Sequence, residues 1–120
     1  MVLTNTELSN IFSNVKSKLA TDFVEVAFGS GTTTETSGDT SLQTETLQQA
    51  LQEQTILSDR VIFSGFVGAG QINGTTINET GFKDAASGNL LQRKVLMTGF
   101  SKTINKEFWT DLVIIPTVTQ

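Results

Sequence analysis

Residues 76–93 read TINETGFKDAASGNLLQR, and this stretch decides the fold. Two runs with strand character flank a short loop, residues 84–88, which contains only Asp, Ala, Ser and Gly. Asp and Ser side chains cap nearby backbone N–H groups, and Gly accepts a positive φ, so this composition favours a turn. The stretch therefore predicts a β-hairpin with a five-residue loop.

The predicted loop also fixes how the two strands should pair. With residues 84–88 as the loop, Glu79 faces Arg93 across the hairpin. Opposite charges directly across an antiparallel pair stabilise by roughly 0.2–1 kcal/mol. Their neighbours on that face are apolar or small, Gly81 among them. We therefore predict a partly buried, structural ion pair between Glu79 and Arg93.

A helix is predicted over residues 5–20, ahead of the β region. Its apolar side chains recur at helical spacing and form one face, which consists of Leu8, Ile11, Phe12, Val15 and Leu19. Thr4 or Asn5 can cap its first turn. We expect this face either to pack on the core or to dock on a neighbouring subunit.

The remaining chain is predicted to be β-structure. Besides the first strand of the hairpin, strands are expected over residues 22–28, 49–57, 61–69, 90–97 and 107–117. Apolar side chains on both faces of residues 61–69 are typical of a central strand. Residues 45–57 also fit a helix in part, and Gly-Ser-Gly at residues 29–31 is interpreted as a tight turn rather than a phosphate-binding loop.

Together these elements predict one mainly β domain over residues 1–120. The expected architecture is an antiparallel β-sandwich or small barrel of five or six strands, spanning residues 22–117, with one N-terminal helix. Residues 32–44 are polar and Thr-rich, so we predict an exposed loop that is mobile in the free protein and ordered by a partner. Trp109 is predicted to be a half-buried core residue rather than a sugar-stacking platform.

Composition excludes several function classes. The 120 residues include no Cys and no His, which removes disulfides, thiolate or imidazole metal sites and His-dependent catalysis. A net charge of −4 without a basic cluster argues against nucleic-acid binding. No apolar run reaches the ~20 residues of a membrane span, and the first residues do not resemble a signal peptide. We therefore predict a non-enzymatic protein without catalytic residues, cofactor or metal, made in a cytoplasm, with no nucleic-acid or membrane partner.

Three sequence blocks occur in a defined order. They are LTNT at residues 3–6 before the amphipathic helix, VAFGSGT at 26–32 with TSL and Glu45 downstream, and TINETGF at 76–82 followed by a block at 84–91. In this combination the chain resembles the small attachment domains of tailed bacteriophages, found at the N-terminus of tail fibres and in tail-collar or baseplate proteins. The chain departs from that family's pattern at Glu25, Gln48 and Lys83, where members often carry His, Arg and an aromatic residue.

The resemblance implies a structural protein of the virion that acts as a tail fibre, collar or baseplate attachment or adaptor subunit. It implies other virion proteins as partners and a symmetric homo-oligomer, with a trimer among the possible forms. A capsid decoration or head-fibre protein is the alternative within the same class. A carbohydrate-binding β-sandwich is an alternative of another class, which the single Trp and the absence of Tyr count against.

Overall fold

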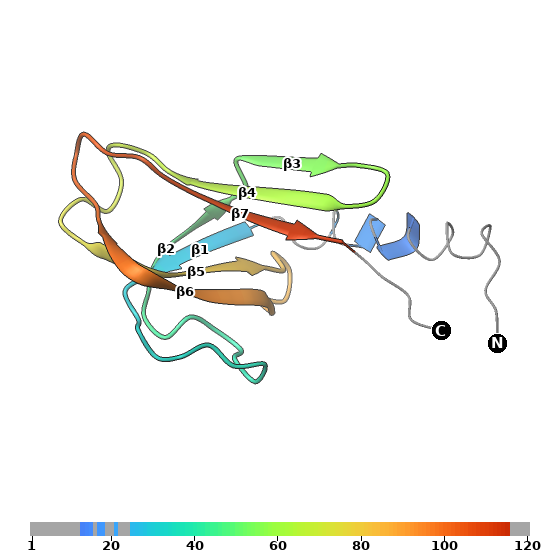
Figure 1. Ribbon diagram of the computed structural model, residues 1–120, viewed down its shortest axis with the longest axis horizontal. Helices are drawn as coiled ribbons and strands as arrows, with labels where there is room; N and C mark the ends of the chain where they lie inside the picture. Colours follow the sequence, from blue (N-terminus) through green and yellow to red (C-terminus); the bar gives the residue numbers. More distant parts are fainter. Residues whose placement is uncertain (1–12, 16, 19–20, 22–24, 116–120) are drawn as a thin grey trace.

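Two antiparallel sheets make up the protein, as a computed structural model of residues 13–15, 17–18, 21 and 25–115 describes it. The strands are β1 (Glu25–Gly29), β2 (Glu45–Ala50), β3 (Glu53–Ile56), β4 (Val61–Val67), β5 (Thr76–Lys83), β6 (Leu90–Ser101) and β7 (Phe108–Ile114). A four-stranded sheet has the order β2-β1-β5-β6, and a three-stranded sheet has the order β3-β4-β7. The sheets lie face to face in Figure 1, which confirms the predicted antiparallel sandwich with more strands than expected.

The core lies between the two sheets and follows from alternation along the strands. In β4, Val61, Phe63 and Val67 are fully buried, while the alternate residues Ile62, Ser64 and Phe66 are only partly buried. From the four-stranded sheet, Phe28 and Phe82 point at them, and the rings of Phe63 and Phe82 lie 6.0 Å apart. β4 pairs with both β3 and β7, so the prediction of a central strand is confirmed.

The predicted strand over residues 49–57 is wrong, because this segment contributes to both sheets. β2 ends at Ala50 in one sheet, and β3 begins at Glu53 in the other. The backbone N–H of Gln52 donates to the carbonyl of Ser64, which fixes the point where the chain crosses. Residues 45–57 contain no Gly or Pro that would mark a break between two strands. Only the pairing with other strands shows where β2 ends and β3 begins.

The predicted N-terminal helix is described only in part. Residues 13–15, 17–18 and 21 are helical, whereas Leu8, Ile11, Phe12 and Leu19 of its predicted apolar face lie outside the described residues. Val15 belongs to that face and is exposed. In Figure 1 these helical residues lie beyond one end of the three-stranded sheet along the long axis of the molecule.

A buried lysine that the sequence analysis missed joins two connections between the sheets. Lys102 is 1% exposed, and its Nζ donates to the carbonyl oxygens of Ala69 and Thr103 and to Oδ1 of Asn73 at 2.8–3.0 Å. Its backbone also pairs with Gly74 and Thr75. All three ammonium donors are satisfied, which offsets much of the cost of burying the charge.

Candidate functional site

The hairpin of β5 and β6 exists as predicted, but its register is different. The loop comprises residues 84–89, one residue longer than expected, and a bulge beside Lys83 adds one more residue to β6. Glu79 therefore faces Val95, and Gly81 faces Arg93. Because the shift at this point is two residues, Glu79 and Arg93 keep the common face that was predicted for them. Arg93 still reaches Glu79 diagonally, with Nε 2.8 Å from Oε1.

Glu79 is completely buried and accepts four hydrogen bonds. Oε1 accepts from Arg93 Nε and from the backbone N–H of Gln43, both at 2.8 Å. Oε2 accepts from the backbone N–H groups of Gly31 and Thr44 at 2.7 and 2.8 Å. Each oxygen thus has two donors, which is the full capacity of a carboxylate. A residue in β5 thereby fixes both ends of the long loop between β1 and β2.

Arg93 completes this arrangement from the other side. Its side chain is 2% exposed, and its two terminal nitrogens donate to Asp39 Oδ2 at 3.1 Å and Thr33 Oγ1 at 3.2 Å. We name the set of Glu79, Arg93 and their loop partners the clasp. The clasp holds residues 30–44 against the outer face of the four-stranded sheet, where Figure 1 shows this loop.

The clasp bears on two predictions about this segment. Residues 29–31 do not form a tight turn, because Gly29 ends β1 and Ser30 pairs with Thr44 at the base of the loop. The loop is largely exposed, as predicted, but the chain itself supplies the contacts that hold it. These contacts argue against a loop that only a partner orders, and its mobility in the free protein stays a prediction. Donors and acceptor lie 35–48 residues apart in the sequence, so no local pattern reveals them.

Close packing explains why glycine occupies two positions in the clasp. A Cβ on Gly31 would overlap Oε2 of Glu79 and the side chain of Gln43. A Cβ on Gly81 would lie 2.9 Å from Leu42 and 2.8 Å from Leu90. Leu42 is the one buried apolar side chain among the described residues 30–44, and it packs into the space that Gly81 leaves.

The charges of the clasp stabilise one another. Burial raises the pKa of Glu79, but the hydrogen bonds from Arg93, Thr44, Gln43 and Gly31 together lower that pKa below its ordinary value. The backbone N–H of Thr36 and the side chain of Arg93 also hold the pKa of Asp39 down. Both carboxylates are therefore charged at neutral pH. Glu79 has no exposed oxygen to offer a substrate, and the arrangement is suited to holding a loop in place.

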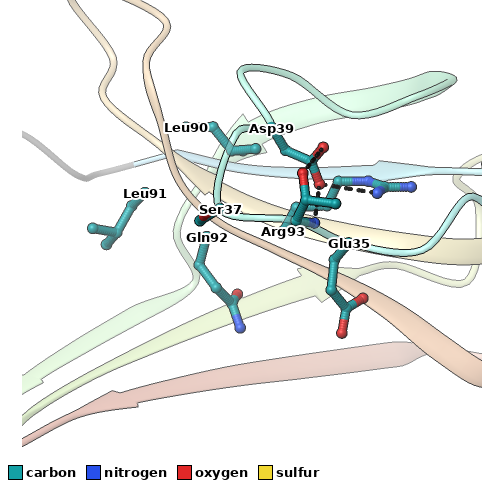
Figure 2. A pocket seen from close by; sticks show the side chains of 8 residues that line it. Glu35, Ser37, Asp39, Leu90, Leu91, Gln92 and Arg93 are labelled. Atoms are coloured by element: carbon teal, nitrogen blue, oxygen red, sulfur yellow. Dashed lines mark hydrogen bonds and ion pairs between the residues drawn. The ribbon is translucent and has the colours of Figure 1, made fainter.

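A shallow cleft of about 360 Å³ opens beside the clasp, between the loop and the start of β6. Figure 2 shows Asp39 directly beside Arg93, with Glu35 further along the loop. Oε2 of Glu35 accepts a hydrogen bond from the backbone N–H of Val95, an edge position of the four-stranded sheet. Within this cleft the arginine is already neutralised by Glu79 and Asp39, which leaves it little charge for an anionic ligand.

The three departures from the phage pattern lie together on the same outer face. Glu25 faces Lys83 across the β1–β5 pair, and Gln48 follows in β2. The side-chain amide of Gln48 donates to Glu25, and Nζ of Lys83 lies 2.7 Å from Gln48 Oε1 and 3.1 Å from Glu45 Oε1. Glu25, Gln48 and Lys83 thus form one polar cluster, in which Gln48 contacts both of the others.

Trp109 lies on the opposite side of the molecule from the clasp, and its prediction as a core residue is wrong. It is 52% exposed on the outer face of the three-stranded sheet, where it pairs with Phe66. The two ring centroids are 4.4 Å apart. Phe108, one position earlier, points inward and contacts Phe28 instead. The sequence showed the alternation in β7 correctly. It did not show which face of β7 packs against the four-stranded sheet.

Comparison with protein-family models, with curated proteins and with solved structures found no match to this chain. Among the described residues, no group of three acidic side chains is close enough to hold a metal ion. In the same part of the chain, no helix is both long and apolar enough to cross a membrane.

Proposed function

We propose that this chain is a non-enzymatic structural subunit of a tailed-virus particle, an attachment or adaptor subunit of the tail fibre, collar or baseplate. The blocks that carry the resemblance support this proposal. Gly31, Leu42 and Gly81 come from the second and third blocks. The backbone N–H of Gly31 donates to Glu79, and Leu42 packs beside Gly81 on the same face. These blocks thus have a physical reason to occur together, since they form one buried unit.

The observation that carries the proposal is an apolar surface at one end of the three-stranded sheet. Four large side chains there are 43–50% exposed: Ile56, Leu57, Val113 and Ile115. We name these residues the apolar end. Ile56 pairs with Val61, which pairs with Ile114, so the ends of all three strands meet there. Exposed apolar side chains gathered at one end of a sheet are typical of protein–protein contacts.

The N-terminal helix extends from the same end. Lys18 lies close enough to Asp84, at the tip of the β5–β6 hairpin, to lower the pKa of that carboxyl group, although backbone N–H groups contribute more. Val15, one residue of the predicted apolar face, is exposed. The apolar end and the exposed side chain of Val15 suit association with further copies of the chain, as a symmetric tail component requires.

Analytical ultracentrifugation of the full chain tests this proposal. We expect a discrete oligomer that dissociates when Ile56 and Leu57 are both replaced by Ser. The matched control is Ile104→Ser, because Ile104 is 67% exposed in the β6–β7 connection, away from the apolar end. A chain that stays monomeric at about 100 μM, or that loses its oligomer equally in the control, would contradict the proposal.

The position on the particle needs a separate experiment. An antibody against the exposed loop residues 84–89 can be imaged by electron microscopy on intact particles. We expect the label at the tail. Label on the head would instead support the alternative of a capsid decoration or head-fibre protein.

A further inference from the structure

The outer face of the three-stranded sheet carries a second surface, distinct from the apolar end. Its centre is the pair of Phe66 and Trp109, whose rings are tilted by 42° and lie 4.4 Å apart. Phe66 faces Trp109 directly across the β4–β7 pair. Trp109 is half exposed, so the pair presents an aromatic surface to solvent.

A row of polar side chains crosses all three strands beside this aromatic pair. Asp111 faces Ser64 across the β4–β7 pair, and Ser64 faces Glu53 across the β3–β4 pair. Asp111 follows Trp109 by two positions, so both lie on the same face about 7 Å apart. Within the described residues, none of these polar side chains forms a hydrogen bond or an ion pair, and the indole N–H of Trp109 has no acceptor.

This combination matches the chemistry of a sugar ring. A pyranose has one face of C–H groups, which stacks on an aromatic ring, and a rim of hydroxyl groups, which donate to carboxylates. We infer that the outer face of the three-stranded sheet binds a neutral saccharide, with one pyranose on Trp109 and its hydroxyls hydrogen-bonded to Asp111 and Ser64. Glu53 extends the acceptor row for a second ring.

Charge narrows the class of saccharide. Asp111 and Glu53 place two negative charges beside the ring, and the net charge of the chain is −4. A uronic or sialic acid would meet like charges at short range, which costs binding free energy. Neutral hexoses and N-acetylated amino sugars do not carry this penalty.

The polar row also argues against an apolar protein partner on this surface. It separates Trp109 and Phe66 from the apolar pair Ile62 and Val113 further along the sheet. A flat apolar partner that covered both pairs would bury Asp111 without a hydrogen bond, which is unfavourable. A saccharide supplies hydroxyl donors at that position.

The single Trp of the chain allows a direct test, because tryptophan emission reports on Trp109 alone. The full-length protein is titrated with β1,4-linked glucose, β1,4-linked N-acetylglucosamine and α1,4-linked glucose hexasaccharides, and with oligogalacturonate as the acidic probe. We expect at least one neutral hexasaccharide to shift the emission to shorter wavelength and to reduce acrylamide quenching, with saturation below about 10 mM. Oligogalacturonate should have no effect.

Variants distinguish this site from general surface binding. Calorimetric titration with the same hexasaccharide should show at least tenfold weaker binding for Asp111→Asn and no binding for Trp109→Ala. The matched control is Asp59→Asn, because Asp59 is exposed and paired with Arg60 in the β3–β4 turn. No response to any neutral probe, or equal binding by Trp109→Ala, would overturn the inference. An emission shift that depends on protein concentration alone would also overturn it, since Trp109 would then lie in a subunit contact.

Discussion

The two outer faces of the sandwich differ in what covers them. On the four-stranded sheet, residues 30–44 fold back over the strands, and the clasp buries Glu79 and Arg93 beneath them. On the three-stranded sheet, Trp109 and Val113 are about half exposed. The charged residues are thus buried and the aromatic residue is exposed, the reverse of a simple hydrophobicity rule. Among the described residues, no loop covers the outer face of the three-stranded sheet, which we call the bare face.

The largest expected effect comes from breaking the clasp. Glu79→Ala would leave Nε of Arg93 and three backbone N–H groups buried without an acceptor, so we expect a loss of roughly 3–5 kcal/mol in the free energy of unfolding. Glu53→Ala on the bare face is the matched control and should change stability by less than about 0.5 kcal/mol. Urea unfolding measures both.

The double variant sharpens this test. Glu79→Ala combined with Arg93→Ala should cost less than the sum of the two single variants, because removing both partners leaves no unpaired buried charge. Strict additivity would mean that the two side chains do not interact.

Low pH should remove part of the stabilisation that Glu79 provides. The folded-state pKa of Glu79 is depressed, so the unfolded chain takes up the proton first as the pH falls. The stabilisation is therefore complete above about pH 4.3 and is lost as the pH falls through the folded-state value. Thermal melts of the wild type between pH 7 and about pH 3 should show this loss, and Glu79→Gln should show a flatter profile. Equal slopes for the two proteins would exclude Glu79 as its source.

A smaller effect is expected at the base of the loop. Gly31→Ala would place a Cβ against Glu79 and Gln43, and overpacking of this kind costs roughly 1–3 kcal/mol. Hydrogen exchange should show protected amides at Gln43 and Thr44 in the wild type and faster exchange in the variant. Gly70→Ala is the control, because nothing lies within 4 Å of a Cβ at that position. Rapid exchange at both amides in the wild type would show that the clasp is open in solution.

A gain in stability is expected inside the sandwich. The hydroxyl of Thr80 is buried without a hydrogen-bond partner on the inner face of the four-stranded sheet. Thr80→Val should therefore stabilise the protein by about 1 kcal/mol. Thr46→Val should have the opposite sign, because the Thr46 hydroxyl donates to the carbonyl of Phe28. Differential scanning calorimetry compares the two, and a destabilised Thr80→Val would indicate that this hydroxyl has a partner.

The smallest effect on folding is expected at the bare face. Trp109→Ala removes a half-exposed ring and one aromatic contact, so it should cost under about 1 kcal/mol. Phe108→Ala, one position earlier and facing the core, should cost roughly 3 kcal/mol. A reversed order in urea unfolding would mean that the orientation of β7 is opposite to the one described.

Local pattern predicted much of this fold. Apolar side chains on both faces predicted a central strand over residues 61–69, and alternation predicted the last strand over residues 107–117. The structure has both strands with slightly shorter bounds, as β4 and β7. The hairpin and the contact of Glu79 with Arg93 were also predicted. The two side chains are in contact although the predicted register was wrong. The shift is an even number of residues, so both side chains stay on one face, and the long arginine side chain reaches Glu79 diagonally.

The sequence could not show what covers each face. The division of residues 45–57 between two sheets depends on pairing with β1 and β4, which are distant in the chain. Gly31 belongs to the candidate site because it donates a hydrogen bond to Glu79, 48 positions away in the sequence. Asp39 belongs to it because it accepts one from Arg93, 54 positions away. One signal in the sequence is a carboxylate, Glu79, whose neighbours on its strand face are apolar or small and which follows a polar, Gly-containing loop. The spacing between the loop and Glu79 does not show that they are in contact.

By itself, the sequence determined the sandwich class, the alternation within each strand and the absence of Cys and His chemistry, because these depend on composition and on neighbouring residues. Only the tertiary structure decided that Glu79 is buried and Trp109 exposed. The physical reason is that burial depends on which surface finds a partner. The clasp supplies backbone donors from the loop to a carboxylate in β5, and among the described residues nothing equivalent covers the aromatic pair on the other sheet.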